Sequence, residues 1–284
     1  MTEKRPLSPE VNLRRILGSP TYLRAYEDIA LLHRVDLRPV RLQLEAMKAE
    51  IVQDEQDVRS TLVFFGGARI RTPEDAAERV KVAELKAAKD PESTKLAEEL
   101  KIAENLLAMS PFYEEARKLA QIVSLHGQAD GLLDLVICTG GGPGIMEAGN
   151  RGAFEVGKKS IGLNITLPHE QEPNAYVTPE LCFQFHYFAI RKMHFLMRAK
   201  AAVFFPGGFG TMDELFETLT LIQTGKMDRV PLILVGKDFW NRLIDWEYFR
   251  LAGTISPEDV ELFSFCDTAD EAWDVIHCAY PSID

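Results

Sequence analysis

The chain has 284 residues, of which 46% are hydrophobic, and a formal net charge of −11. This length can bury one large α/β core with a helical appendage, but hardly two full domains. The acidic balance argues against a nucleic-acid polymer or an anionic membrane as a partner, so any phosphate ligand would have to be held by local groups.

Cysteine spacing and hydropathy predict the compartment. The four cysteines show no CxxC spacing, and two of them lie in apolar, strand-like runs. Free thiols in a reducing cytosol fit this pattern best. The first residues lead into a polar helical pattern rather than an apolar signal core. Because no stretch reaches the about 18 uncharged apolar residues of a membrane span, we expect a soluble, cytoplasmic protein.

The first part of the chain is predicted to be helical. Apolar residues recur with helical spacing from about residue 9 to residue 57, and Gly18, Pro20 and Pro39 interrupt them. We therefore predict a helical N-terminal extension over residues 1–57, followed by a single domain over residues 58–284.

Apolar runs that read as strands follow at 61–65, 132–138, 160–165, 201–205 and 230–235. Helix-length segments separate them, which predicts an α/β fold with a parallel sheet covered by helices on both faces. The segment of about 73–130 is too long for one crossover helix. Its charge-rich middle at 89–93 indicates a helical insertion of two or three helices with an exposed turn.

Three strands are predicted to end in glycine-containing turns. Their residues are Gly66, Gly67 and Ala68 in the first turn, Gly140, Gly141, Gly142 and Gly144 in the second, and Gly207, Gly208 and Gly210 in the third. Turns at the carboxyl ends of parallel strands line the usual ligand crevice, and glycine lets the backbone approach an anion. The alternative is that a glycine serves only the turn geometry.

Familiar cofactor motifs are incomplete. The second turn lacks the last glycine of the dinucleotide fingerprint, and the run 152–158 resembles a phosphate-binding loop but continues with Lys159 and precedes a strand. No serine-hydrolase elbow and no paired metal-ligand spacing of histidines occurs. We expect neither a metal nor a redox cofactor.

A basic segment at 186–200 reads as a helix that leads into the next strand. Its cations, among them Arg191 and Arg198, could hold a nucleotide and stabilise negative charge. Solvated charge is the alternative for Lys192, Arg198 and Lys200. We expect packing or surface roles for its histidines.

The run from Pro206 to Glu214 combines a glycine turn with a carboxylate one helical turn later. A phosphate grip does not need this carboxylate. Thr211 and Glu214 also have the spacing of a capping box, in which both side chains bond backbone amides at a helix start. Asp213 and Glu217 compete as functional carboxylates, and the spacing alone leaves the choice open.

Together these motifs resemble the LONELY GUY (LOG) family of nucleoside 5′-monophosphate phosphoribohydrolases, over about residues 60–240. The run from Pro206 to Glu214 matches the PGGxGTxxE hallmark, Arg191-Lys192 falls at the place of the family's Arg-Lys pair, and the segment 140–148 looks like its glycine turn. The resemblance implies a Rossmann-like open sheet and a homodimer or higher homo-oligomer. It places Arg191 and Glu214 in the positions of a catalytic pair, with the glycine turns, Lys192 and Thr211 binding the nucleotide.

The reaction implied is hydrolysis of the N-glycosidic bond of a nucleoside 5′-monophosphate, such as AMP or a cytokinin riboside monophosphate, to a free base and ribose 5-phosphate. A carboxylate suits it, since positive charge builds on the ribose or a water must be deprotonated. A non-catalytic nucleotide or molybdenum-cofactor carrier is the alternative, because it would use the same glycine turns. The label of lysine decarboxylase, which some relatives carry, finds no separate support in a Schiff-base lysine.

Overall fold

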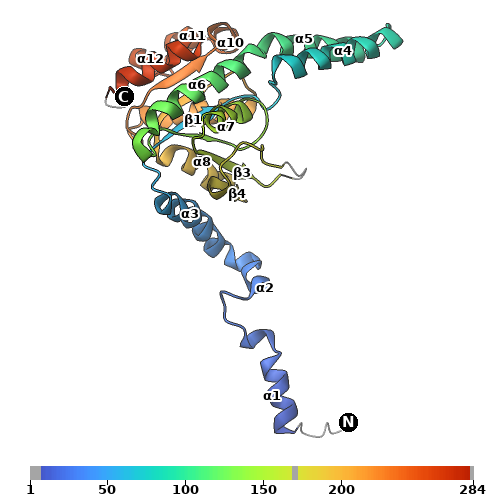
Figure 1. The fold of residues 1–284 in the computed structure, drawn as a ribbon, viewed down its shortest axis with the longest axis vertical. Coiled ribbons are helices and arrows are strands. Elements are labelled where there is room, and N and C mark those ends of the chain that lie inside the picture. Colours follow the sequence, from blue (N-terminus) through green and yellow to red (C-terminus); the bar gives the residue numbers. More distant parts are fainter. Residues whose placement is uncertain (1–7, 168–171, 282–284) are drawn as a thin grey trace. The chain divides into compact units, whose positions relative to one another are not determined.

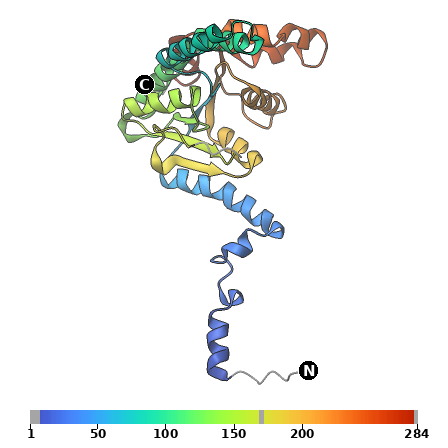
Figure 2. The same ribbon diagram turned by 90° about the vertical axis from the view of Figure 1, so that its right-hand side faces the viewer.

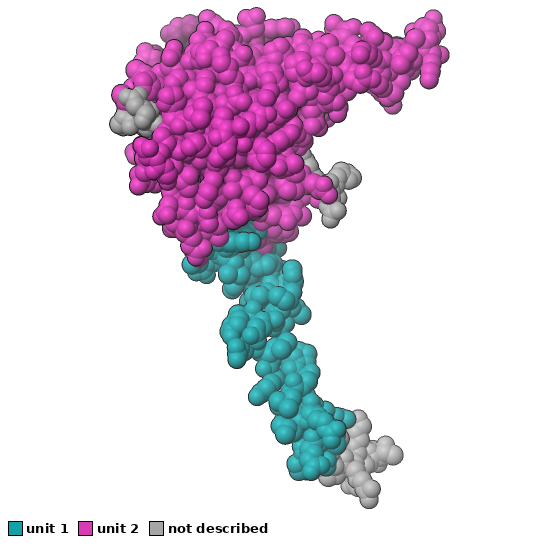
Figure 3. All heavy atoms as spheres, viewed as in Figure 1, with its two compact units in different colours: residues 1–48 teal, residues 49–284 magenta. Residues whose placement is uncertain are grey.

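The computed structural model describes residues 8–167 and 172–281. The chain forms two compact units, residues 1–48 and 49–284, which are coloured separately in Figure 3. In the first unit, α1 (Pro9–Leu17) begins after the cap Ser8 and ends at Gly18. The other helices that begin there are η1 (Pro20–Tyr22), α2 (Ile29–Leu32), η2 (Val35–Leu37) and α3 (Arg38–Glu55). The expected helical character of this region is therefore confirmed.

The second unit contains a seven-stranded parallel sheet with the order β4-β3-β2-β1-β5-β6-β7 (Figures 1 and 2). The strands are β1 (Thr61–Phe65), β2 (Val136–Thr139), β3 (Ser160–Ile165), β4 (Cys182–Phe185), β5 (Ala199–Phe204), β6 (Leu232–Val235) and β7 (Ser264–Cys266). Strand β1 is central, and the chain order reverses between β1 and β5. This arrangement confirms the predicted Rossmann-like α/β sheet.

Helices connect the strands. They are α4 (Pro73–Lys89), α5 (Thr94–Met109), α6 (Pro111–Gly127), α7 (Ile145–Glu155), α8 (Phe188–Met197), α9 (Phe209–Gln223), α10 (Lys237–Leu243), α11 (Trp246–Leu251) and α12 (Ala269–Ala279). Short 3₁₀ segments are η3 (Ala129–Gly131), η4 (Pro179–Leu181) and η5 (Pro257–Glu261). Among the described residues, no helix is both long and apolar enough to span a membrane. All four cysteines are free.

Helices cover both faces of the sheet. Since successive strand residues point to opposite faces, the side chains on both sides of each strand are buried. In β1, Val63 and Phe65 pack in the core that includes residues of α8, α9 and α10. Leu62 and Phe64 belong to the opposite core, with residues of α6, α7 and α12. Strands that are mostly apolar are therefore required, and this is the pattern that the sequence displays.

The expected insertion of residues 73–130 consists of two different parts. Helices α4 and α5 pack against each other and project from the sheet as a hairpin (Figure 1). Helix α6, in contrast, packs against α7, and its Tyr113, Leu119 and Val123 are fully buried in the core. Only the hairpin of α4 and α5 therefore stands apart from the sheet.

Element boundaries differ from the expectations by one or two residues in β5 and β6, and more clearly in three other places. Strand β2 begins at Val136 rather than at residue 132, because Leu135 has a positive φ of 47° that interrupts the extended backbone. The short strands β4 and β7 at the two edges of the sheet were not among the five predicted strands, although Cys182 of β4 lies in one of the two strand-like runs that contain cysteines. The basic helix is shorter than expected, since α8 ends at Met197 and leaves Arg198 and Lys200 outside it.

Candidate active site

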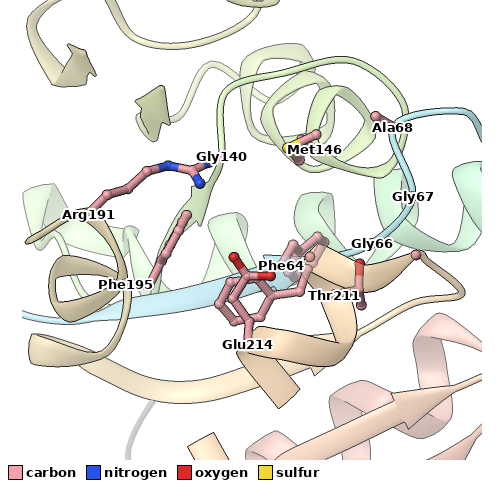
Figure 4. Close-up of a pocket in the computed structure, with 13 residues that line it drawn as sticks. Phe64, Gly66, Gly67, Ala68, Gly140, Met146, Arg191, Phe195, Thr211 and Glu214 are labelled. Atoms are coloured by element: carbon pink, nitrogen blue, oxygen red, sulfur yellow. The ribbon is translucent and has the colours of Figure 1, made fainter. Parts of the chain in front are cut away.

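The three glycine turns meet at the carboxyl ends of β1, β2 and β5. The amide of Gly67 donates to the carbonyl oxygen of Pro206 at 2.9 Å, and the amide of Ile145 donates to that of Gly67 at 3.3 Å. The turns surround a cavity of about 260 Å³, shown in Figure 4. It lies where the strand order reverses, the place where open α/β sheets bind ligands.

The cavity brings together nine of the fourteen predicted site residues. These are Gly66, Gly67, Ala68, Gly140, Arg191, Gly208, Gly210, Thr211 and Glu214. Gly141, Gly142, Gly144 and Gly207 shape the same turns without lining the cavity, and Lys192 lies elsewhere. The lining also includes Phe64, Phe65, Met146 and Phe195, which the sequence reasoning missed. The three phenylalanines also belong to the hydrophobic core. The sequence pattern of a core residue is the same whether or not it also lines a cavity, so it gave no signal for a binding role.

Close packing explains two of the glycines. A Cβ atom at Gly140 would lie 2.6 Å from Nη2 of Arg191, so a side chain there would displace the guanidinium. Gly144 has a φ of +73°, and a Cβ atom there would lie 2.4 Å from the carbonyl oxygen of Gly67. Glycine therefore permits both the direct approach of two turns and the placement of Arg191.

Arg191 reaches the cavity from α8. It is 9% exposed, its Nε donates to the carbonyl oxygen of Leu163 at 2.6 Å, and its guanidinium lies 4.9 Å from the ring centre of Phe195. Burial lowers the pKa of Arg191, and the negative charge of Glu214 opposes this effect. The hydrogen bond and the ring contact fix a cation in a largely dry position.

Glu214 enters the cavity from the first part of α9. The capping-box interpretation of Thr211 and Glu214 is wrong, because α9 begins at Phe209 with Gly208 as its N-cap and no side chain caps it. Thr211 is already the third helical residue. It is buried, and its hydroxyl lies against Gly207. The carboxylate of Glu214 is thereby available for another role.

The environment of Glu214 alters its acidity. Burial raises the pKa of Glu214 to about 7, although the nearby Arg191 acts in the opposite direction. In Figure 4 the Arg191 guanidinium and the Glu214 carboxylate lie on different sides of the cavity, and no direct ion pair joins them within the described residues. A carboxyl group near its pKa at neutral pH can accept or donate a proton.

The competing carboxylates lie outside the cavity. Lys192 Nζ is 2.9 Å from Asp213 Oδ2 and 3.1 Å from Glu217 Oε2, and none of these three side chains lines the cavity. The structure thus distinguishes Glu214 from its two acidic neighbours on α9. The role of Lys192 in phosphate binding stays a prediction, which this pairing does not favour.

The amino end of α9 borders the cavity. Its first amides have no intrahelical partner, and no described side chain caps them. Gly208 and Gly210 lie at this end and line the cavity. The unpaired amides and the positive end of the helix dipole together favour a phosphate there. No group of three or more His, Cys, Asp or Glu side chains that could hold a metal occurs among the described residues.

The histidines of the basic segment take no part in this lining. His194 is 4% exposed, and its Nδ1 lies 3.4 Å from Oε1 of Glu50. Arg198 contacts the same carboxylate through Nη2 at 2.9 Å. His194 therefore has the packing role that the sequence predicted.

Residues 146–276 match a protein family described as possible lysine decarboxylase. The pyrimidine/purine nucleotide 5′-monophosphate nucleosidase of Escherichia coli strain K12 is 37% identical over 121 residues, which are 39% of this chain and 26% of that enzyme. The corresponding enzyme of strain O157:H7 gives the same values. The aligned part thus spans about a quarter of the length of these curated relatives.

Two solved structures match parts of this chain. The X-ray structure of TM1055 has 17% sequence identity and a TM-score of 0.46, and it covers 77% of this chain and 99% of its own. The molybdenum cofactor binding protein from Rippkaea orientalis has 18% identity and a TM-score of 0.41, with coverage of 59% and 86%.

The family resemblance expected from the motifs is confirmed for residues 146–276. This segment contains Arg191 and the whole run from Pro206 to Glu214, whereas the first two glycine turns precede it.

Proposed function

We propose that the protein hydrolyses the N-glycosidic bond of a nucleoside 5′-monophosphate. The observation that carries this proposal is the position of Glu214, a partly buried carboxyl group with a pKa raised to about 7, in the cavity that Arg191 also lines. The similarity of 39% of the chain to a pyrimidine/purine nucleotide 5′-monophosphate nucleosidase also supports it.

The 5′-phosphate would bind at the amino end of α9. The amides around Gly208 and Gly210 would donate to the phosphate oxygens, and the helix dipole would add partial positive charge. This contact is remote from the glycosidic bond. Its binding energy would hold the ribose in place and align C1′ with Glu214.

In the reaction, the bond between C1′ and the base nitrogen breaks, and its electron pair leaves with the base, which takes up a proton. A water molecule adds to C1′ and gives its proton to Glu214. The carboxylate also stabilises the positive charge that develops on the ribose before the water bond is complete. The products are the free base and ribose 5-phosphate.

Arg191 would act through its fixed charge. Its positive charge lowers the pKa of Glu214 and partly opposes the effect of burial. The ionised form of Glu214 is therefore populated near neutral pH. Its guanidinium would also donate to a ribose hydroxyl or to the phosphate. Replacement of Arg191 should therefore reduce both substrate affinity and turnover.

The test is to incubate the protein with purine and pyrimidine nucleoside monophosphates, including AMP and a cytokinin riboside monophosphate, and to measure free base and ribose 5-phosphate. Glu214→Gln and Arg191→Ala should lose at least about a hundredfold in kcat/KM, the usual size of an acid–base contribution. Asp213→Asn is the matched control. It removes the same charge from the neighbouring residue, and the side chain of Asp213 is 60% exposed.

The outcomes separate the two functions that the motifs permit. Tight binding of nucleotide by the wild type without release of base would refute hydrolysis and support a carrier. Full activity of Glu214→Gln would refute the assigned role of this residue. A homodimer or higher homo-oligomer, as the resemblance implies, is part of the proposal, and light scattering of the purified protein measures it.

A further inference from the structure

A second cavity, of about 310 Å³, lies between the segment 69–71 and the hairpin of α4 and α5. Arg69 and Arg71 reach it from the segment that follows the first glycine turn, and Lys86 reaches it from α4. Apolar side chains of both helices, among them Val82 and Ile102, form the rest of its wall. No lining residue is shared with the candidate active site.

Three of the four cations that line this cavity lack acidic partners among the described residues. Within the described parts of the chain, Arg69, Arg71 and Lys86 form no ion pair, and Nε of Arg71 is buried without a hydrogen-bond acceptor. A buried donor that has no acceptor is destabilising, because it has lost its water without gaining a partner. An anion in the cavity would supply the missing acceptor.

Other charges at this cavity are already neutralised locally. Arg79 pairs with Asp75 at 3.2 Å, and the two carboxylates of the wall, Glu78 and Glu99, pair with lysines at 3.4 and 3.9 Å. The remaining excess charge is positive, in a chain whose formal net charge is −11. Such a local excess attracts small anions even when the whole protein repels them.

The apolar wall limits the class of ligand. Val82 is 44% exposed and Ile102 is 46% exposed, so both would lose contact with water if a hydrophobic group entered. Inorganic phosphate would use the cations but leave this wall uncovered. We propose that the cavity binds an organic anion, with a phosphate, sulfonate or carboxylate group on the arginines and an aromatic or branched apolar body between α4 and α5.

The test uses two probes that share an apolar body. The full-length protein is titrated by fluorescence with the anion 1-anilinonaphthalene-8-sulfonate and with its neutral analogue N-phenyl-1-naphthylamine. Arg71→Gln should weaken binding of the anion about tenfold, the usual effect of a lost charge-assisted contact, and leave binding of the neutral probe unchanged. Ala103→Phe, which fills the cavity from α5, should weaken binding of both.

Lys101→Gln is the matched control, because Lys101 lies on the same hairpin outside the cavity with its side chain 70% exposed. Lys86→Gln repeats the charge test if Arg71→Gln folds poorly, and circular dichroism checks each variant. Inorganic phosphate should displace the sulfonate only at much higher concentration than phenyl phosphate does. Unchanged binding of the anion by Arg71→Gln and Lys86→Gln, or an equal loss in Lys101→Gln, would overturn the proposal.

Discussion

Removal of the Glu214 carboxylate should stabilise the protein at alkaline pH, because burial of this group opposes folding. Its pKa is about 7 in the folded chain, against an ordinary value of 4.5. The difference of about 2.5 units corresponds to about 3 kcal/mol at 1.36 kcal/mol per unit. The side chain retains some contact with solvent, which reduces the expected effect to about 2 kcal/mol.

The sign follows from proton binding. Between pH 4.5 and about 7 the folded state keeps a proton on Glu214 that the unfolded chain has released. The stability of the wild type therefore falls as pH rises through this window, and the full cost is present above pH 7. Glu214→Gln carries no such group. Its advantage over the wild type should grow from a small value at pH 5 to about 2 kcal/mol at pH 8.

Urea unfolding followed by circular dichroism at several pH values measures this difference. Glu214→Asp is the control, since it keeps a carboxyl group in the same cavity and should follow the wild type in the direction of its pH dependence. If the unfolding free energies of wild type and Glu214→Gln ran parallel from pH 5 to pH 8, Glu214 would not be desolvated. The physical basis of its catalytic role would then be lost.

Three further predictions concern the same site. If Glu214 accepts the proton of the attacking water, kcat/KM for AMP should rise with pH and level off above about 7, and a rate that falls through this range would contradict that role. Gly140→Ala should cut activity at least about tenfold by displacing the guanidinium of Arg191, and an unchanged rate in steady-state assays would show that Arg191 is not needed in this position. Gly144→Ala should lose more than about 1 kcal/mol in urea unfolding, since its φ is +73° and its Cβ would meet the Gly67 carbonyl; stability equal to the wild type would refute the close contact of the two turns.

The amino-acid sequence by itself determined the fold class. Strands such as β1 and β6 must be largely apolar, because helices cover both sides of the sheet, and this requirement is visible without coordinates. Edge strands carry a weaker signal. Strand β7 has only three residues, and β4 has an exposed Gln184 between buried phenylalanines, so neither forms a continuous apolar run.

The sequence also indicated the glycine turns, since a turn that carries several glycines after a strand is locally recognisable. The choice among Asp213, Glu214 and Glu217 was decided only by the tertiary structure. All three carboxylates lie on one helix, and their difference depends on what packs beside that helix: Lys192 pairs with two of them, whereas the cavity buries the third. The starting residue of α9 likewise excluded the capping box.

The cavity between Arg71 and the hairpin of α4 and α5 is the clearest case of a feature that sequence spacing does not contain. Arg71 and Ile102 are separated by about thirty residues and meet only because the two helices fold back on each other. Local patterns specify the elements, because a helix or strand depends on its own neighbours in the chain. Burial, acidity and cavity walls depend on contacts between distant segments, and these exist only once the chain has folded.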